Sequence, residues 1–176
     1  FYHCFSSNKH GDIFTFLVDV EGLSFPQAVE QLAEQAGVEL RALTKDEERK
    51  ISGRKKLYSI MEMANDFFIN NLLNDNRALG YLNQRGINKE AISEYKIGYA
   101  KDNFSSLHKY LLDKGILNED ILLAGLIIKS EKKKNSYYDR YRDRIIFPIT
   151  NTYGKIVGFG GRVINEDDKP KYMNSP

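Results

Sequence analysis

The sequence has a single cysteine, Cys4, which excludes an internal disulfide framework. It has no apolar run long enough to span a membrane, and no signal-peptide pattern opens it. Its net charge is only +2, so the overall composition does not mark it as a nucleic-acid-binding protein. We therefore expect a cytoplasmic protein without a membrane partner, whose function must be sought in how its residues are distributed.

A length of 176 residues, with 41% hydrophobic and 28% charged residues, is typical of one medium or two small domains. The chain opens with Phe1 rather than methionine and stops at Asn-Ser-Pro. We expect both ends to be cuts through a longer protein.

The most informative stretch is the last part of the chain, where a β-hairpin is predicted. Two apolar, β-branched runs, 145–149 and 156–159, flank the short loop Asn151-Thr152-Tyr153-Gly154. Arginines occupy every second position before the first run: Arg140, Arg142 and Arg144. Because strand side chains alternate with a period of two, these arginines are predicted to project from one face. Asp143 would face the opposite side and pair with a neighbouring charge.

Glycines and further basic residues follow the second run. Gly160 and Gly161 allow the backbone to bend or a ligand to approach closely. A row of guanidinium groups beside such a backbone suits phosphate, which arginine binds with a planar fork of donors.

The middle of the chain is predicted to be helical. Apolar residues at spacings of three and four give the strongest helix from Leu57 to Leu73. The charged stretch 41–56 is interpreted as an exposed linker, although Thr44 to Glu47 could cap a helix within it. Shorter helices are predicted at 12–20, 24–37, 76–84, 106–112 and 118–123, strands at 1–5, 97–100 and 126–128, and an exposed turn at 131–135.

Several motifs, in order and closely spaced, resemble the RNA polymerase domain of bacterial DNA primases. They are A-L-G-Y-L-x-x-R-G-I, Y-K-I-G-Y-A, R-x-R-I-x-F-P-I, G-x-x-x-G-F-G-G-R and K-Y-x-N-S-P. The opening string Y-H-C-F-x-x-x-x-x-G-D resembles the end of the CHC2 zinc-binding domain of the same family.

The resemblance implies an α+β fold in three parts. Residues 1–40 would be the C-terminal part of a zinc-ribbon domain with two helices, and 41–56 the charged linker. Residues 57–176 would be the N-terminal subdomain of the primase catalytic core, with helices packed on a mostly antiparallel sheet. The TOPRIM domain of the family would be absent.

The resemblance also implies which residues bind template DNA and nucleotides. These are Arg142 and Arg144 of the R-x-R motif, Arg162 of F-G-G-R, Arg85 of Y-L-x-x-R-G, and Lys171, Tyr172 and Asn174 of K-Y-x-N. Phe104 is a candidate for stacking on an unpaired base. Simpler interpretations remain: the charges could solvate a sheet edge, Arg85 could bind the last carbonyls of its helix, and Phe104 could belong to the core.

The metal sites of the family are incomplete in this chain. Cys4 matches the third zinc ligand, but Ser7 occupies the position of the fourth, so we expect no tight zinc binding. Cys4 is interpreted instead as a small buried apolar residue, and His3 and His10 are alternative ligands. Catalytic Mg²⁺ is held by TOPRIM acids, for which the polar turn Glu166-Asp167-Asp168 is no substitute.

The predicted function is therefore that of a DNA primase, a nucleotidyltransferase that makes RNA primers on single-stranded DNA during replication. Its partners would be single-stranded DNA, ribonucleoside triphosphates and, through a region outside this chain, the replicative helicase. This segment would contain no catalytic residue and be inactive alone. The alternatives are a non-catalytic single-stranded-DNA-binding module, or an interaction domain whose arginines are paired internally with acids.

Overall fold

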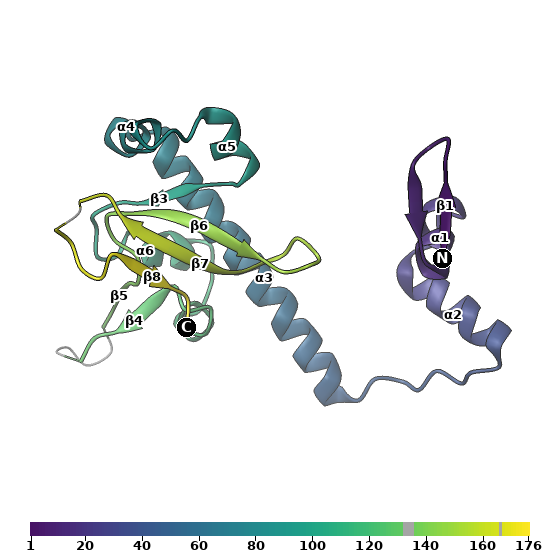
Figure 1. The fold of residues 1–176 in the computed structure, drawn as a ribbon. Helices are drawn as coiled ribbons and strands as arrows, with labels where there is room; N and C mark the ends of the chain where they lie inside the picture. The colour runs from purple at the N-terminus through teal and green to yellow at the C-terminus, as the bar shows by residue number, and fades with distance from the viewer. Residues whose placement is uncertain (132–135, 166) are drawn as a thin grey trace. The chain divides into compact units, whose positions relative to one another are not determined.

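The computed structural model describes residues 1–131, 136–165 and 167–176, which divide into two compact units, Phe1–Glu48 and Arg49–Pro176 (Figure 1). The predicted turn at 131–135 lies almost wholly outside the described residues, as does Glu166. Within the described ranges, no helix is both long and apolar enough to cross a membrane.

The first unit is a small hairpin followed by two helices. Strand β1 (Tyr2–Cys4) pairs antiparallel with β2 (Lys9–Gly11), and helices α1 (Ile13–Val20) and α2 (Phe25–Ala36) follow. A capping box of Ser24 and Gln27 begins α2, and Gly37 ends it with a φ of +64°. Strand β2 was not predicted, because Lys-His-Gly carries no β-branched residue.

The long helix α3 (Lys45–Leu73) begins much earlier than the predicted Leu57. Most of the charged stretch interpreted as a linker is therefore helical. The Glu47 carboxylate accepts a hydrogen bond from the Thr44 backbone N–H at 2.9 Å, and the Glu47 N–H donates to the Thr44 hydroxyl at 3.3 Å. This capping box starts the helix, and Lys, Arg and Glu propagate it well even without an apolar face.

The second unit is built on one antiparallel sheet with the strand order β3-β6-β7-β8. The predicted hairpin is confirmed as β6 (Arg144–Thr150) and β7 (Ile156–Val163), in which Ile145 pairs with Arg162. Strands β3 (Gly98–Ala100) and β8 (Tyr172–Asn174) pair with its outer edges. The remaining elements are α4 (Asn76–Gln84), α5 (Lys89–Glu94), α6 (Ser106–Asp113), α7 (Asn118–Leu123), β4 (Ile127–Lys129) and β5 (Tyr137–Asp139).

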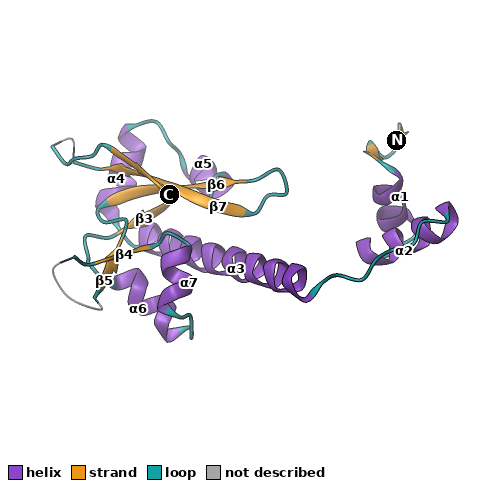
Figure 2. Ribbon diagram, turned by 90° about the horizontal axis from the view of Figure 1, so that it is seen from below, coloured by secondary structure: helices purple, strands orange, loops and turns teal. Residues whose placement is uncertain are grey.

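The two faces of this sheet bury different cores. Phe68 of α3 and the α6 leucines pack against Ile146 and Phe159, on the side where α3, α6 and α7 lie (Figure 2). On the other face, Leu82 of α4 and Ile92 of α5 pack against Ile145. At Gly98, a Cβ atom would lie 2.4 Å from the Cβ of Phe68, so only glycine lets β3 approach α3 this closely.

Candidate nucleic-acid interface

The segment before β6 is not the regular strand that the alternating arginines predicted. Asp143 adopts a φ of +46°, and β6 begins only at Arg144. The arginines nevertheless converge, because they line one concavity of about 270 Å³. Its charged lining residues are Arg140, Arg142, Arg144 and Lys169, together with Asp102, Asp143 and Asp168. We call this site the arginine concavity.

Each of the three arginines is held by a backbone carbonyl. Arg140 Nε donates to the Gly125 oxygen at 2.6 Å, and an Arg142 terminal nitrogen donates to the Asp139 oxygen at 2.7 Å. Arg144 is buried and donates to the Gly161 oxygen at 3.3 Å, and its burial lowers its pKa. Across the ranges 1–131, 136–165 and 167–176, none of the three belongs to an ion pair. The interaction-domain alternative, which required internal pairing, is therefore not supported.

Arg142 is also fixed by aromatic rings. Its guanidinium carbon lies 4.7 Å from the centroid of Phe104 and 5.3 Å from that of Tyr138. Phe104 is 66% exposed, so the interpretation of this residue as part of the core is wrong. Stacking on two rings orients the flat guanidinium while its edge keeps donors for a ligand.

Asp143 carries the charge pair predicted for it, but with a distant partner. Its carboxylate accepts hydrogen bonds from Arg77 of α4 at 3.0 and 2.8 Å and from the Tyr99 hydroxyl at 2.6 Å. Burial alone would raise the pKa of Asp143, but the bonds from Arg77 and Tyr99 outweigh it and hold that pKa below its usual range. The hydrogen-bonded charge partner of Asp143 is therefore Arg77, although its charge also acts on the neighbouring Arg144.

Arg162 and Tyr172 lie on the opposite face of the sheet from Arg144. Arg162 pairs with Ile145 and with Tyr172, whereas Arg144 pairs with Val163, and neighbouring positions alternate between faces. The single cluster expected from the sequence is therefore divided. Asn174 also belongs to the Arg162 face, and the exposed Lys171 accepts a hydrogen bond from the Val163 N–H through its carbonyl.

Tyr81 links the arginines of this second face, and sequence analysis missed it. Its hydroxyl accepts a hydrogen bond from Arg162 Nε at 2.6 Å, and the Arg85 guanidinium lies 5.4 Å from its ring centroid. Arg162 in turn donates to the Tyr172 hydroxyl and lies 5.1 Å from that ring. We call Arg85, Tyr81, Arg162 and Tyr172 the tyrosine–arginine row. The available signal was the position of Tyr81 four residues before Arg85, one helical turn away.

The hairpin of the first unit offers a poor set of zinc ligands. The half-buried Cys4 thiol lies 3.2 Å from the Ser6 hydroxyl, whose hydrogen bond, with that of Ser7, lowers the pKa of Cys4 to about 6. The rings of His3 and His10 face each other across the hairpin at 5.9 Å. In the described part of the chain, no three His, Cys, Asp or Glu side chains are placed to hold a metal. One thiol beside serines does not meet the four-ligand requirement of structural zinc.

An α+β domain with arginines on both faces of its sheet belongs to a class suited to phosphate-bearing ligands. Residues 67–176 match the family described as DNA primase catalytic core, N-terminal domain, and residues 1–48 match the CHC2 zinc finger family. The chain therefore belongs to the DnaG-type bacterial DNA primase family, as its motifs suggested.

Individual relatives agree over most of the chain. The DNA primase of Deinococcus radiodurans is 39% identical over 176 residues, which are 100% of this chain and 29% of that protein. A primase of Aquifex aeolicus, solved with its zinc-binding and RNA polymerase domains, has a TM-score of 0.63 and 32% identity over 99% of this chain and 41% of that one. A DnaG catalytic domain bound to single-stranded DNA has a TM-score of 0.65 and 34% identity, over 72% of this chain and 40% of that one. The predicted α+β primase-core fold is confirmed.

Proposed function

We propose that this chain is the template- and nucleotide-binding part of a DNA primase that synthesises short RNA primers on single-stranded DNA during replication. The arginine concavity carries the proposal, because its three arginines are free of ion pairs within the described ranges. Such arginines remain able to bind phosphate, which template and incoming nucleotides both carry. The solved relative that binds single-stranded DNA supports the same assignment.

The two faces of the sheet would contact different parts of the nucleic-acid ligand. In the concavity, Arg142 would present its stacked guanidinium to a phosphate. On the other face, the ring of Tyr172 is 58% exposed and would stack on a base or ribose while Arg162 binds the adjoining phosphate. Asn174 would extend this second contact, whereas the backbone of Lys171 pairs with Val163, which lies on the Arg144 face. Phe104 would stack a base only on the side of its ring that Arg142 leaves open.

Primer synthesis needs Mg²⁺, which neutralises the triphosphate and stabilises the attacking and leaving oxygens. Because no suitable group of acids is formed in the described part of the chain, we place the metal-binding carboxylates in the TOPRIM domain of the full protein. Ribonucleoside triphosphates would be its substrates, the replicative helicase its partner, and the bacterial cytoplasm its location. We expect this chain alone to bind DNA and to synthesise no primer.

The test is a fluorescence-anisotropy titration with a short single-stranded DNA at low and moderate salt. Replacing Arg142 with alanine should weaken binding and reduce the slope of log K against log salt by about 1, as for one lost phosphate contact. Arg162→Ala tests the other face, and Lys109→Ala on exposed α6 surface is the matched control. A DNA affinity that is unchanged in both the Arg142→Ala and the Arg162→Ala variants would refute the proposed interface.

A second candidate is a non-catalytic single-stranded-DNA-binding module. Two exposed rings, Phe104 and Tyr172, favour it, because stacking platforms bind strands without nucleotides. Primer synthesis by the full-length protein separates the two. The primase proposal expects Arg142→Ala to reduce primer yield, whereas the module expects no primers even from the unmodified full-length protein.

A further inference from the structure

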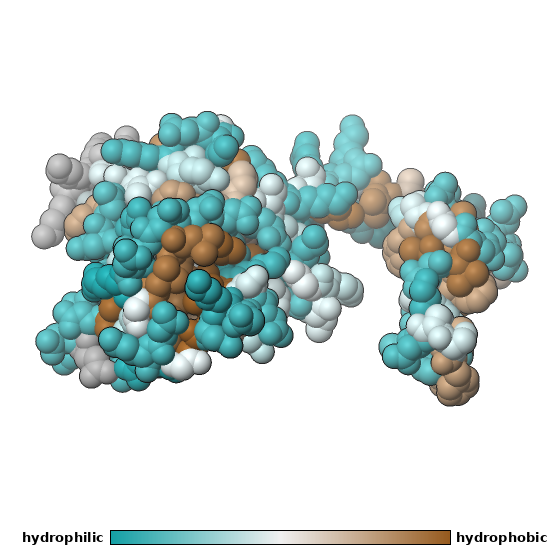
Figure 3. Space-filling view, turned by 90° about the horizontal axis from the view of Figure 1, so that it is seen from above, coloured by the Kyte–Doolittle hydropathy of each residue, from teal (hydrophilic) through white to brown (hydrophobic). Residues whose placement is uncertain are grey.

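A second surface feature lies away from both arginine sites. Helices α3, α4 and α5 enclose an apolar groove of about 380 Å³, within the roughly 300–1,000 Å³ usual for binding pockets. It appears as an apolar hollow framed by polar residues in Figure 3. Its lining residues are Ile69, Leu73, Leu79, Lys89, Ile92, Ser93 and Lys96, and we call it the α5 groove.

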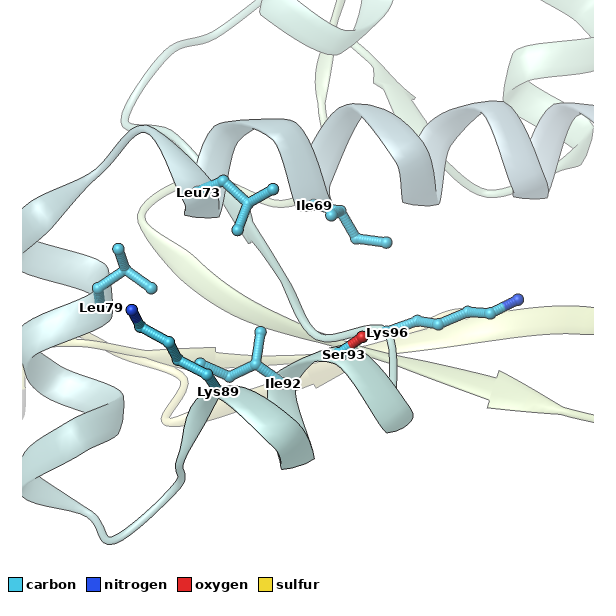
Figure 4. Close-up of a pocket in the computed structure, with 7 residues that line it drawn as sticks. All are labelled: Ile69, Leu73, Leu79, Lys89, Ile92, Ser93 and Lys96. Carbon is cyan, nitrogen blue, oxygen red and sulfur yellow. The ribbon is translucent and has the colours of Figure 1, made fainter.

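The α5 groove is open and carries charge of one sign. Leu73 is 60% exposed at its rim, beside the other apolar side chains of the groove. The amino groups of Lys89 and Lys96 point to opposite ends of the groove (Figure 4). No acid lines the groove, and neither lysine forms an ion pair with any described residue.

Lys96 occupies a backbone position that suits glycine. Its φ is +50°, and the Ile97 N–H bonds back to the Ile92 oxygen at 3.0 Å in a left-handed helix ending. Helices α2 and α4 end in the same way with Gly37 and Gly86, at φ values of +64° and +75°. An L residue is disfavoured there, so folding alone would select glycine rather than this lysine.

We propose that the α5 groove docks an acidic, apolar-anchored peptide segment of a partner protein. Apolar side chains of the segment would fill the hollow between α3 and α5, covering Leu73. Acidic residues before and after these anchors would bind Lys89 at one end and Lys96 at the other. This is an interaction distinct from DNA binding, since the groove and the arginine sites share no residue.

Other occupants fit less well. The groove offers no arginine and no aromatic ring, the groups on which nucleic-acid bases stack. A membrane surface would need several apolar side chains that protrude, whereas of these only Leu73 is exposed and the others line a hollow. Charge complementarity therefore favours an acidic peptide.

The test is unbiased selection of 12-residue peptides from a display library on the full chain, with counter-selection on a Leu73→Asp variant. The expected enriched sequences combine two or more apolar residues with flanking Asp or Glu. Enriched basic sequences, or no enrichment over the Leu73→Asp variant, would overturn the proposal. Enrichment that depends on Arg142 would assign the peptide to the arginine concavity instead.

The best peptide is then measured by anisotropy on charge variants. Lys89→Glu and Lys96→Glu should each weaken it about tenfold or more, while Lys109→Glu, the same charge change on α6, should leave it unchanged. Lys96→Gly removes the amine and also the strain of a left-handed conformation at a residue with a side chain. It should therefore raise the melting temperature of the chain and still weaken its affinity for the peptide. Unchanged affinity in Lys96→Gly and Lys89→Glu would exclude the groove. Single-stranded DNA binding should be unaffected in all these variants.

Discussion

At the scale of single residues, Tyr81 is the group on which the arrangement of the second face depends. Its hydroxyl holds Arg162 and its ring supports Arg85. Tyr81→Phe keeps the ring and removes the acceptor, so Arg162 loses its fixed orientation. We predict a three- to tenfold loss of single-stranded DNA affinity, about the value of one hydrogen bond.

A double-mutant cycle separates this positioning role from general damage. If Tyr81 acts through Arg162, Tyr81→Phe should add nothing to the loss caused by Arg162→Ala. The urea midpoint of Tyr81→Phe should stay close to that of the unmodified protein. Additive losses in the cycle would show that Tyr81 does not act through Arg162.

Asp143 makes the stability of the fold depend on pH in the acid range. Its pKa in the folded chain is depressed, so the pair with Arg77 stabilises the fold above the ordinary carboxyl pKa of about 4 and is lost as the pH falls through the folded-state value. Asn tolerates the left-handed backbone at this position, so Asp143→Asn changes mainly the charge.

We predict that Asp143→Asn lowers the free energy of unfolding by roughly 1 kcal/mol at pH 7. The difference from the unmodified protein should shrink as the pH falls below about 4 in urea titrations. A difference that stays constant over this range would mean that the carboxylate is not the stabilising group.

These residues also show why the sequence predicted the site only in part. The spacing of Arg140, Arg142 and Arg144 correctly indicated that they lie close together, since all three line the arginine concavity. It could not reveal that Asp143 adopts a left-handed backbone conformation, with a φ of +46°, because the alternation rule assumes a regular strand. Likewise, the bond between Arg162 and Tyr81 joins residues 81 positions apart, which no local pattern encodes.

At the scale of elements, the N-terminus of helix α6 is capped by a carboxylate from strand β5. Asp139 of β5 is buried and accepts hydrogen bonds from the backbone N–H groups of Leu107 and His108, both at 2.9 Å. The adjacent Ser105 makes no side-chain cap. Asp139 therefore links β5 to the start of α6, although Asp139 and His108 are 31 residues apart in the sequence.

We predict that Asp139→Ala destabilises the chain by about 2 kcal/mol or more, because the buried N–H of Leu107 and the partly buried N–H of His108 lose their acceptor. The measurement is urea unfolding followed by circular dichroism. Asp113→Ala, at the exposed end of the same helix, is the control and should change stability by less than about 0.5 kcal/mol. Equal effects of the two substitutions would contradict the capping role.

Elements were predictable where their signals are local. Helices α4 and α7 have the predicted bounds, because caps and apolar spacing lie within a few residues. Strands β2, β5 and β8 have three residues each and were missed. A strand this short is defined by the partner that it pairs with, not by its own sequence.

At the scale of the whole molecule, the chain divides into two compact units, and proteolysis can test whether the second is independent of the first. Residues 38–44 contain no helix or strand and are exposed, so they satisfy the conditions for proteolytic nicking. We predict that a glutamate-specific protease cuts first after Glu39. The larger product should resist further digestion.

The product that begins at Leu40 should keep the cooperative thermal transition of the intact chain, because both buried cores of the sheet lie within the second unit. It should also keep the salt-sensitive affinity for single-stranded DNA, since all charged residues of the concavity and the tyrosine–arginine row follow residue 49. Loss of the transition would show that the sheet domain needs the first unit in order to fold. A retained transition with weakened DNA binding would instead assign part of the interface to the first unit, whose exposed lysines and histidines would then be the residues to substitute.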